Sequence, residues 1–163
     1  MTVRPAGPDD IDAVRRVAER SWAVDYPDIL SQETAEAAAG EWYGADSLAA
    51  VLDAERTLLS VIEADDRVVG FAHATWNDDE GEGYILRLYV HPDHRGAGHG
   101  RELLAATRTA LADRGVDRVN AMVLAANDNG NEFYEQFGFE RADESETVID
   151  GESYRENRYV LDV

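Results

Sequence analysis

The chain has 163 residues and a formal net charge of −19, with 34 acidic residues against 15 basic ones, all of them arginine. This length suits one domain with a core of its own, so we expect residues 1–163 to form a single domain. The absence of cysteine excludes disulfides, thiolate metal sites and a catalytic thiol. No apolar run reaches the length of a membrane span and the N-terminus has no apolar leader, which predicts a cytoplasmic protein without a membrane partner.

The acidic residues are spread along the whole chain. Nucleic acid is therefore excluded as a partner, because phosphate contacts need a basic face. The negative charge could steer a cationic substrate or form a hydration coat, and its even spread favours the coat. An acidic composition without lysine also resembles that of proteins from salt-accumulating halophiles.

The first half of the chain alternates between helical and β-rich patterns. Val3-Arg4 predicts a short strand, and a helix capped by Asp9 or Asp10 follows, with an apolar face that runs to Ala18. The other elements expected here are two helices, at residues 31–42 and 47–54, and two strands, at residues 57–63 and 68–76.

The second half begins with a strand at residues 84–90, followed by a glycine-rich loop and a long amphipathic helix that ends at Arg114-Gly115. A strand at 119–124, a short helix at 129–137 and a hairpin around Asp150-Gly151 complete the chain. The order of these elements predicts a mixed α/β domain with a largely antiparallel sheet.

The glycine-rich loop reads Arg-Gly-Ala-Gly-His-Gly-Arg over residues 95–101. Amide groups at a helix N-terminus carry the positive end of the helix dipole, and glycines let the backbone approach an anion. Arg95 and Arg101 add positive charge at the edge of the loop. The pattern favours a phosphate or pyrophosphate site, with a plain connecting turn as the alternative. The lysine of a P-loop is absent.

A second motif follows the next strand. Tyr134 lies seven residues after Asn127, so both residues share one side of the short helix, which Gly138 is suited to end.

Together, the two motifs resemble those of the GNAT superfamily of N-acetyltransferases, over roughly residues 84–139. The family's loop pattern matches Arg95, Gly98 and Gly100, and its later pattern matches Asn127, Phe133-Tyr134 and Gly138-Phe139. The resemblance implies the GNAT fold, an α+β arrangement in which a mixed, mostly antiparallel sheet is flanked by helices. Its two central parallel strands, here 84–90 and 119–124, splay apart.

The resemblance also implies that acetyl-CoA binds in the V between these strands. The pyrophosphate would lie on the loop amides, and the pantetheine arm would run along the preceding strand. Asn127 would bond to that arm, cap the short helix, or do both. The implied acetyl-CoA site comprises Leu88, Tyr89, Val90, Arg95, Gly96, Ala97, Gly98, His99, Gly100, Arg101, Asn127 and Tyr134.

The reaction implied is direct attack of an amine on the thioester in a ternary complex, since no cysteine can carry the acetyl group. Tyr134 matches the tyrosine that often protonates the leaving thiolate in this family, and simple packing is its alternative role. Many members carry a glutamate where this chain has Tyr84. Glu82, two residues earlier, is then a candidate base, directly or through a water, or else a solvated loop carboxylate. His73 is a second candidate.

The acceptor pocket is expected to involve Trp22, Tyr26, His73 and Tyr84. His91, His94 and His99 have no acidic partners at metal-binding spacing, so no metal is expected.

The acceptor is an amine on a small molecule or a peptide, between which the sequence does not choose. The alternative function is a CoA-binding regulatory module that has lost turnover. Tyr134 favours the enzyme, and the missing glutamate at position 84 favours the module. The C-terminal hairpin also offers strand edges on which a homodimer could form.

Overall fold

The computed structural model describes residues 2–25, 49–52, 54–77, 79–149 and 151–163. Of Trp22 only the helical backbone is described, while Tyr26 and the helix expected at residues 31–42 lie outside the described residues. Residues 49–52 are helical, in agreement with the short helix expected at 47–54.

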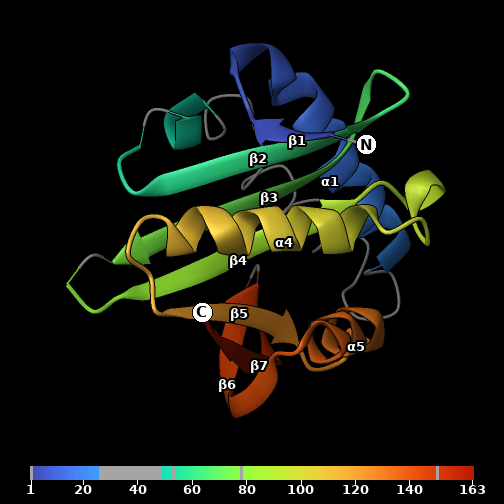
Figure 1. Ribbon diagram of the computed structural model, residues 1–163. Coiled ribbons are helices and arrows are strands. Elements are labelled where there is room, and N and C mark those ends of the chain that lie inside the picture. Colours follow the sequence, from blue (N-terminus) through green and yellow to red (C-terminus); the bar gives the residue numbers. More distant parts are fainter. Residues whose placement is uncertain (1, 26–48, 53, 78, 150) are drawn as a thin grey trace.

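Seven strands form one sheet in the order β1-β2-β3-β4-β5-β7-β6 (Figure 1). Only the contact between β4 and β5 is parallel, so the predicted mixed, mostly antiparallel sheet is confirmed. The strands are β1 Thr2–Pro5, β2 Thr57–Ala64, β3 Arg67–Asn77, β4 Glu82–Val90, β5 Arg118–Leu124, β6 Glu140–Ile149 and β7 Glu152–Asp162.

Helices cover both faces of the sheet: α1 is Ile11–Asp25, α4 is His99–Ala112 and α5 is Asp128–Phe137. The apolar side of α1 packs on one face, where Val14 and Val17 meet Phe71 of β3 in a fully buried cluster. The opposite face is covered by α4, whose Leu104 and Leu111 are buried in a second cluster with the β4 and β5 strands. Two short 3-10 turns, Pro8–Asp10 and Pro92–His94, precede α1 and α4.

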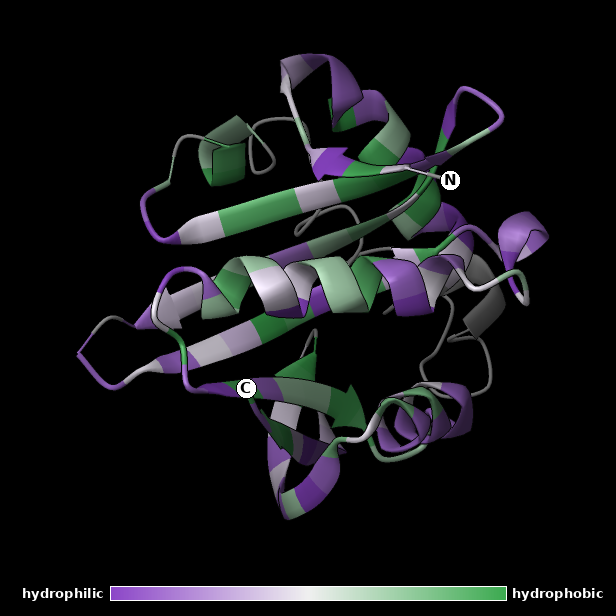
Figure 2. Cartoon of the chain, viewed as in Figure 1, coloured by the Kyte–Doolittle hydropathy of each residue, from purple (hydrophilic) through white to green (hydrophobic). Residues whose placement is uncertain are grey.

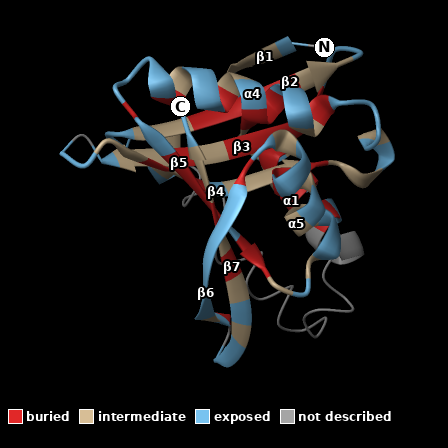
Figure 3. Cartoon of the chain, turned by 60° about the horizontal axis from the view of Figure 1, so that its bottom comes forward, coloured by how far each residue is buried: buried red, intermediate tan, exposed pale blue. Residues whose placement is uncertain are grey.

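Burial follows hydropathy along the sheet. The β2 strand is largely hydrophobic, whereas the turns that join it to β3 and join β3 to β4 are hydrophilic (Figure 2). The outermost strand, β6, is exposed over most of its length, while the inner strands carry the buried positions (Figure 3). Among the described residues, no helix is both long and apolar enough to cross a membrane.

Local sequence signals place most element ends correctly. The turn at Asp65-Asp66 is left-handed at both residues, with φ of 53° and 63°. Gly138 closes α5 in the left-handed conformation, as expected. The regular part of α4 ends at Ala112, and the chain then turns at the expected Gly115, whose φ is 87°. The Gly115 amide bonds to the Ala112 carbonyl and the Val116 amide to the Leu111 carbonyl, so the glycine closes the helix as predicted.

The sheet opens between β4 and β5. Their parallel pairing runs from Glu82–Arg118 to Ile85–Ala121 and stops there. On the β3 side, Leu86 is the extra residue of a bulge, because His73 pairs with Arg87 and Ala74 with Ile85. Beyond this bulge β4 and β5 draw apart towards their C-terminal ends, which confirms the predicted splayed pair of strands (Figure 1).

Candidate functional site

A cleft of about 770 Å³ opens where β4 and β5 part. Its walls come from the C-terminal ends of both strands, the loop before α4, the inner side of α5, and the hairpin of β6 and β7. The volume is that of an ordinary small-molecule site. Because residues 87–90 are paired to β3 on one side and border the cleft on the other, an extended ligand could lie beside them as an added strand.

The glycine-rich loop forms one end of the cleft. Gly96 and Gly98 have φ of 80° and 86°, and a Cβ built on either one would meet no heavy atom within 4 Å. Gly98 is the N-cap of α4 and supplies no side-chain cap, so the first amides of the helix face this space without a side-chain acceptor. Open backbone, free amides and the helix dipole make this end a cradle for an anion.

Four side chains with basic groups line the same end of the cleft: His94, Arg95, His99 and Arg101. The Nε of Arg95 donates to the Val90 carbonyl at 3.0 Å, and the Arg101 guanidinium lies 5.5 Å from the centre of the Phe137 ring. The Nδ1 of His99 is buried without a hydrogen-bond partner in the described part of the chain, so a bound ligand could satisfy it. Ala97 is exposed and is not part of the wall.

The expected strand residues Leu88, Tyr89 and Val90 all border the cleft. The Leu88 side chain packs with the clusters under α4, whereas the Tyr89 ring turns to the α1 face and meets Phe71 edge-on at 5.7 Å. Their backbone is therefore what a ligand between the strands would meet along most of this wall.

Asn127 caps α5, since its side-chain oxygen accepts from the Gly130 amide at 3.0 Å. It also borders the cleft, so the structural role that the sequence offered is observed and its side chain lies within reach of a ligand.

Tyr134 is buried, and desolvation raises the pKa of its phenol far above the usual range. No residue in the described segments bonds to its hydroxyl, and the side chain borders the cleft. The phenol therefore remains protonated and can donate to a bound group.

Glu82, Tyr84 and His73 lie outside the cleft wall. Glu82 starts β4, accepts a hydrogen bond from the Asn120 side chain and lies 3.9 Å from Arg118. Tyr84 sits opposite Asn120 where β4 and β5 are still paired. His73 is largely buried beside Arg87, and burial together with that positive charge lowers its pKa to about 4. The structure brings none of these three candidates to the glycine-rich end.

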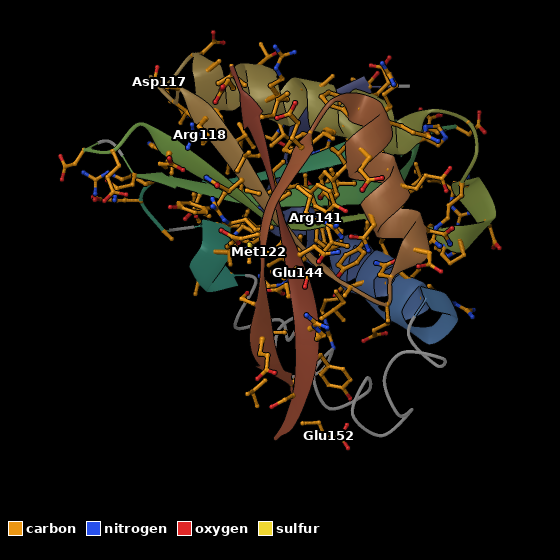
Figure 4. All side chains as sticks on the ribbon, turned by 90° about the horizontal axis from the view of Figure 1, so that it is seen from below. Asp117, Arg118, Met122, Arg141, Glu144 and Glu152 are labelled. Carbon is orange, nitrogen blue, oxygen red and sulfur yellow. The ribbon has the colours of Figure 1, made fainter. Side chains whose placement is uncertain are left out.

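The β6–β7 hairpin also contributes to the cleft, which the sequence did not indicate. Thr147, Ile149 and Glu156 close the cleft on the side away from α4, near Met122 of β5 (Figure 4, where Met122 and the hairpin tip at Glu152 are labelled). Strand alternation predicts which face of β7 carries Glu156, but the sequence does not reveal that this face borders the gap between β4 and β5. Among the described residues that line the cleft, Glu156 is the one carboxylate.

The histidine rings near the loop meet edge-on. The rings of His91 and His94 lie 5.7 Å apart, and those of His94 and His99 lie 6.4 Å apart. In the segments that the structure describes, no three histidine or carboxylate side chains come together as metal ligands would.

Comparison with known proteins agrees with this geometry. The model of the acetyltransferase (GNAT) family matches residues 11–139. The chain is 30% identical over 134 residues to a mycothiol acetyltransferase of Actinosynnema mirum, covering 81% of this chain and 41% of that protein. It is 25% identical over 147 residues to a spermidine N(1)-acetyltransferase of Thermoplasma acidophilum, covering 88% and 90%. The chain thus spans less than half the length of the mycothiol acetyltransferases it matches.

Solved structures share the whole fold. The PaiA N-acetyltransferase of Thermoplasma acidophilum, crystallised with coenzyme A, superposes with a TM-score of 0.83 at 23% identity, covering 97% of this chain and 98% of that one. The ribosomal-protein-S18-alanine N-acetyltransferase of Escherichia coli gives 0.75 at 20% identity, covering 99% and 92%.

Proposed function

This chain belongs to the GNAT acetyltransferase family, and from that premise we propose that it transfers the acetyl group of acetyl-CoA directly to an amine. One observation carries the proposal: a single cleft contains an anion cradle at one end and a protonated, unbonded phenol inside it. The cradle would bind the pyrophosphate of acetyl-CoA, and the phenol would protonate the sulfur of its thioester.

The loop fits the anionic part of the donor. The pyrophosphate would lie on the amides after Gly96 and Gly98, with Arg95 and Arg101 at its edge. The pantetheine arm would follow the unpaired side of β4 next to Leu88 and pass the Asn127 side chain. This path leads the thioester from the loop into the gap between the strands.

Tyr134 would act on the sulfur. A thiolate with a pKa near 8.5 leaves more readily when a donor stabilises its developing charge. Since burial keeps the Tyr134 phenol protonated at any working pH, its O–H remains available as that donor. The reaction requires two proton transfers, one to the leaving sulfur and one from the incoming amine. Tyr134 would supply the first, and a separate proton acceptor is needed for the second.

The acceptor is proposed as an amine on a small molecule or a peptide, the classes that the names of the spermidine and ribosomal-protein relatives indicate for those proteins. The alternative, a CoA-binding module without turnover, is favoured by the location of Glu82, which lies outside the cleft wall where it would not serve as a base.

Release of free thiol from acetyl-CoA separates these functions. We expect release that depends on an added amine, tested with spermidine, a peptide with an N-terminal alanine, and benzylamine. Thermal stabilisation by CoA without release for any of the three amines would favour the regulatory module. If CoA gives no thermal stabilisation and no amine gives thiol release, the chain has no acetyl-CoA site in this cleft.

A further inference from the structure

We infer that Glu156 is the proton acceptor for the incoming amine, and that the acceptor is a primary amine carrying positive charge at neutral pH. The inference rests on the proposed acetyl transfer and adds to it the group that the sequence did not supply. Neither the family resemblance nor the motifs point to this position, which lies after both motifs in the C-terminal strand.

Position is the first argument. Glu156 pairs with Leu124 of β5 on one side and with Ser145 of β6 on the other. Leu124 lies beyond Ala121, the last β5 residue paired to β4, so Glu156 sits beside the opened part of the sheet. It borders the same cleft as Tyr134.

Charge distribution is the second argument. The basic side chains Arg95 and Arg101 line the cleft at the loop, Arg87 lines it on β4, and Glu156 is its one acidic residue in the described part of the chain. An anionic donor would therefore meet the arginines of the loop, and Glu156 is the carboxylate of the wall that a cationic acceptor could meet.

Glu156 is also not engaged by any other described side chain. Other acidic side chains of the hairpin pair with arginine, as Asp143 does with Arg158 and Glu144 with Arg155. For Glu156 the described residues provide neither an ion pair nor a hydrogen bond, although it is half-buried. Burial without a partner raises the pKa of its carboxyl, which makes it a stronger base than an exposed glutamate.

The groups that face Glu156 are consistent with this role. Arg158, two residues along β7, is held by Asp143 and by the Asn120 side chain. Met122 and Leu124 of β5 and Ser145 and Thr147 of β6 carry no charge. The same cleft is also lined by Arg87 of β4, which contacts His73, and by Tyr134.

The proton balance is complete with these groups. Glu156 takes one proton from the ammonium, which leaves a neutral amine whose lone pair forms a bond to the acetyl carbon. As the carbon–sulfur bond breaks, the sulfur takes the Tyr134 proton, and the phenol takes the second proton from nitrogen. Glu156 then loses its proton to water, so that the products are the amide, the free thiol and one proton.

The test compares Glu156→Gln, Glu156→Asp and the matched control Glu146→Gln, which changes an exposed glutamate on the neighbouring strand. Each is assayed with spermidine, the alanyl peptide and benzylamine from pH 6 to 9. Glu156→Gln is expected to lower kcat/KM for the amine by about 10²–10⁴ near pH 7. The loss should shrink as pH rises towards the pKa of the amine, because more free amine is then present. Glu156→Asp should restore part of the rate, and Glu146→Gln should match the wild type.

Two further measurements separate this role from a structural one. The melting temperature of Glu156→Gln should not fall, because a neutral amide avoids the cost of an unpaired, half-buried carboxylate, and stabilisation by CoA should be unchanged. Wild-type kcat/KM and pH profile in Glu156→Gln would overturn the inference, as would a loss that is equal at every pH. The same pH-dependent loss in Glu82→Gln alone would assign the base to Glu82. An inactive wild type with all three amines would overturn the proposed function itself, and this inference with it.

Discussion

The ring of Tyr134 stacks on the ring of Tyr159, with centroids 6.1 Å apart and planes inclined by 21°. Tyr159 is itself fixed, because the one proton of its hydroxyl is shared between two acceptors, Asn131 Oδ1 at 2.7 Å and Glu135 Oε1 at 3.1 Å. Phe133 and Phe139 meet the Tyr134 ring edge-on at 5.2 and 5.3 Å. The neighbours therefore hold the Tyr134 ring in place without help from its hydroxyl.

This arrangement makes Tyr134→Phe a clean test of the phenol. The ring should keep its packing, so CoA binding and the melting temperature should stay close to wild type. Turnover should fall by about 10²–10⁴ if the hydroxyl serves the leaving sulfur. Steady-state rates combined with single-turnover acetylation measure the chemical step. An unchanged single-turnover rate would assign Tyr134 to packing.

The fold was predictable from the sequence where local signals are strong. Alternation of apolar residues and turn residues located the strands. The glycines before α4 and the side chain of Asn127 were recognisable as helix starts from their residue types alone. That Glu156 lines the cleft was not predictable, because this depends on the gap between β4 and β5, which are far from it in sequence. The place of Glu82 outside the cleft wall was not predictable for the same reason: strand alternation gives its face, but does not reveal that the sheet opens at the other end of β4.

Gly98 provides a test of the anion cradle with a matched control. Gly98 and Gly115 have φ of 86° and 87°, and neither would place a Cβ within 4 Å of another heavy atom. Valine should therefore strain both backbones similarly, by about 1–2 kcal/mol. Only the Gly98 side chain would enter the space in front of the α4 amides. We expect Gly98→Val to abolish the thermal shift caused by acetyl-CoA and Gly115→Val to retain it. Equal shifts in both variants would place the pyrophosphate elsewhere.

Acid stability should depend on Asp10. Its carboxylate is buried and accepts from Arg4 at 2.8 and 2.9 Å and from the Gly7 amide at 2.7 Å. The Arg4 hydrogen bonds lower the pKa of Asp10 below the usual aspartate value, against the opposing effect of burial. A lowered pKa means that the folded state favours the ionised form. The resulting stability is therefore present above the ordinary aspartate pKa and is lost as pH falls through the lowered value.

Asp10→Asn should cost about 1–3 kcal/mol near pH 7, because it removes one of the two carboxylates that bond to Arg4 in the described part of the chain and leaves Glu63. Denaturant melts from pH 2 to 7 measure this cost, which should disappear at the acid end. Asp9→Asn is the control, since Asp9 is exposed one residue away. A cost that did not change with pH would mean that packing, and not the ionised pair, is what the variant loses.

The last prediction concerns salt. A net charge of −19 without lysine should oppose the compact state through self-repulsion in dilute buffer. Part of that charge gathers on the exposed strand β6, with Glu140, Asp143, Glu144 and Glu146. At an ionic strength of ~0.01 M the Debye length is ~30 Å, so carboxylates repel one another across much of the molecule. At about 1 M it is ~3 Å, and only adjacent charges interact.

We therefore expect the midpoint of urea unfolding, followed by circular dichroism, to rise along a potassium chloride series up to molar concentration. Potassium sulfate should raise it further, because sulfate also strengthens apolar burial. Repulsion predicts most of the gain below about 0.5 M, where the Debye length shortens fastest, whereas a general effect of salt on apolar burial would continue linearly above it. A midpoint that is flat or falls with chloride would show that the acidic surface is not an adaptation to salt. Because screening also removes long-range attraction, acceptor selection at molar salt would then depend on contacts inside the cleft, and the effect of Glu156→Gln should survive there undiminished.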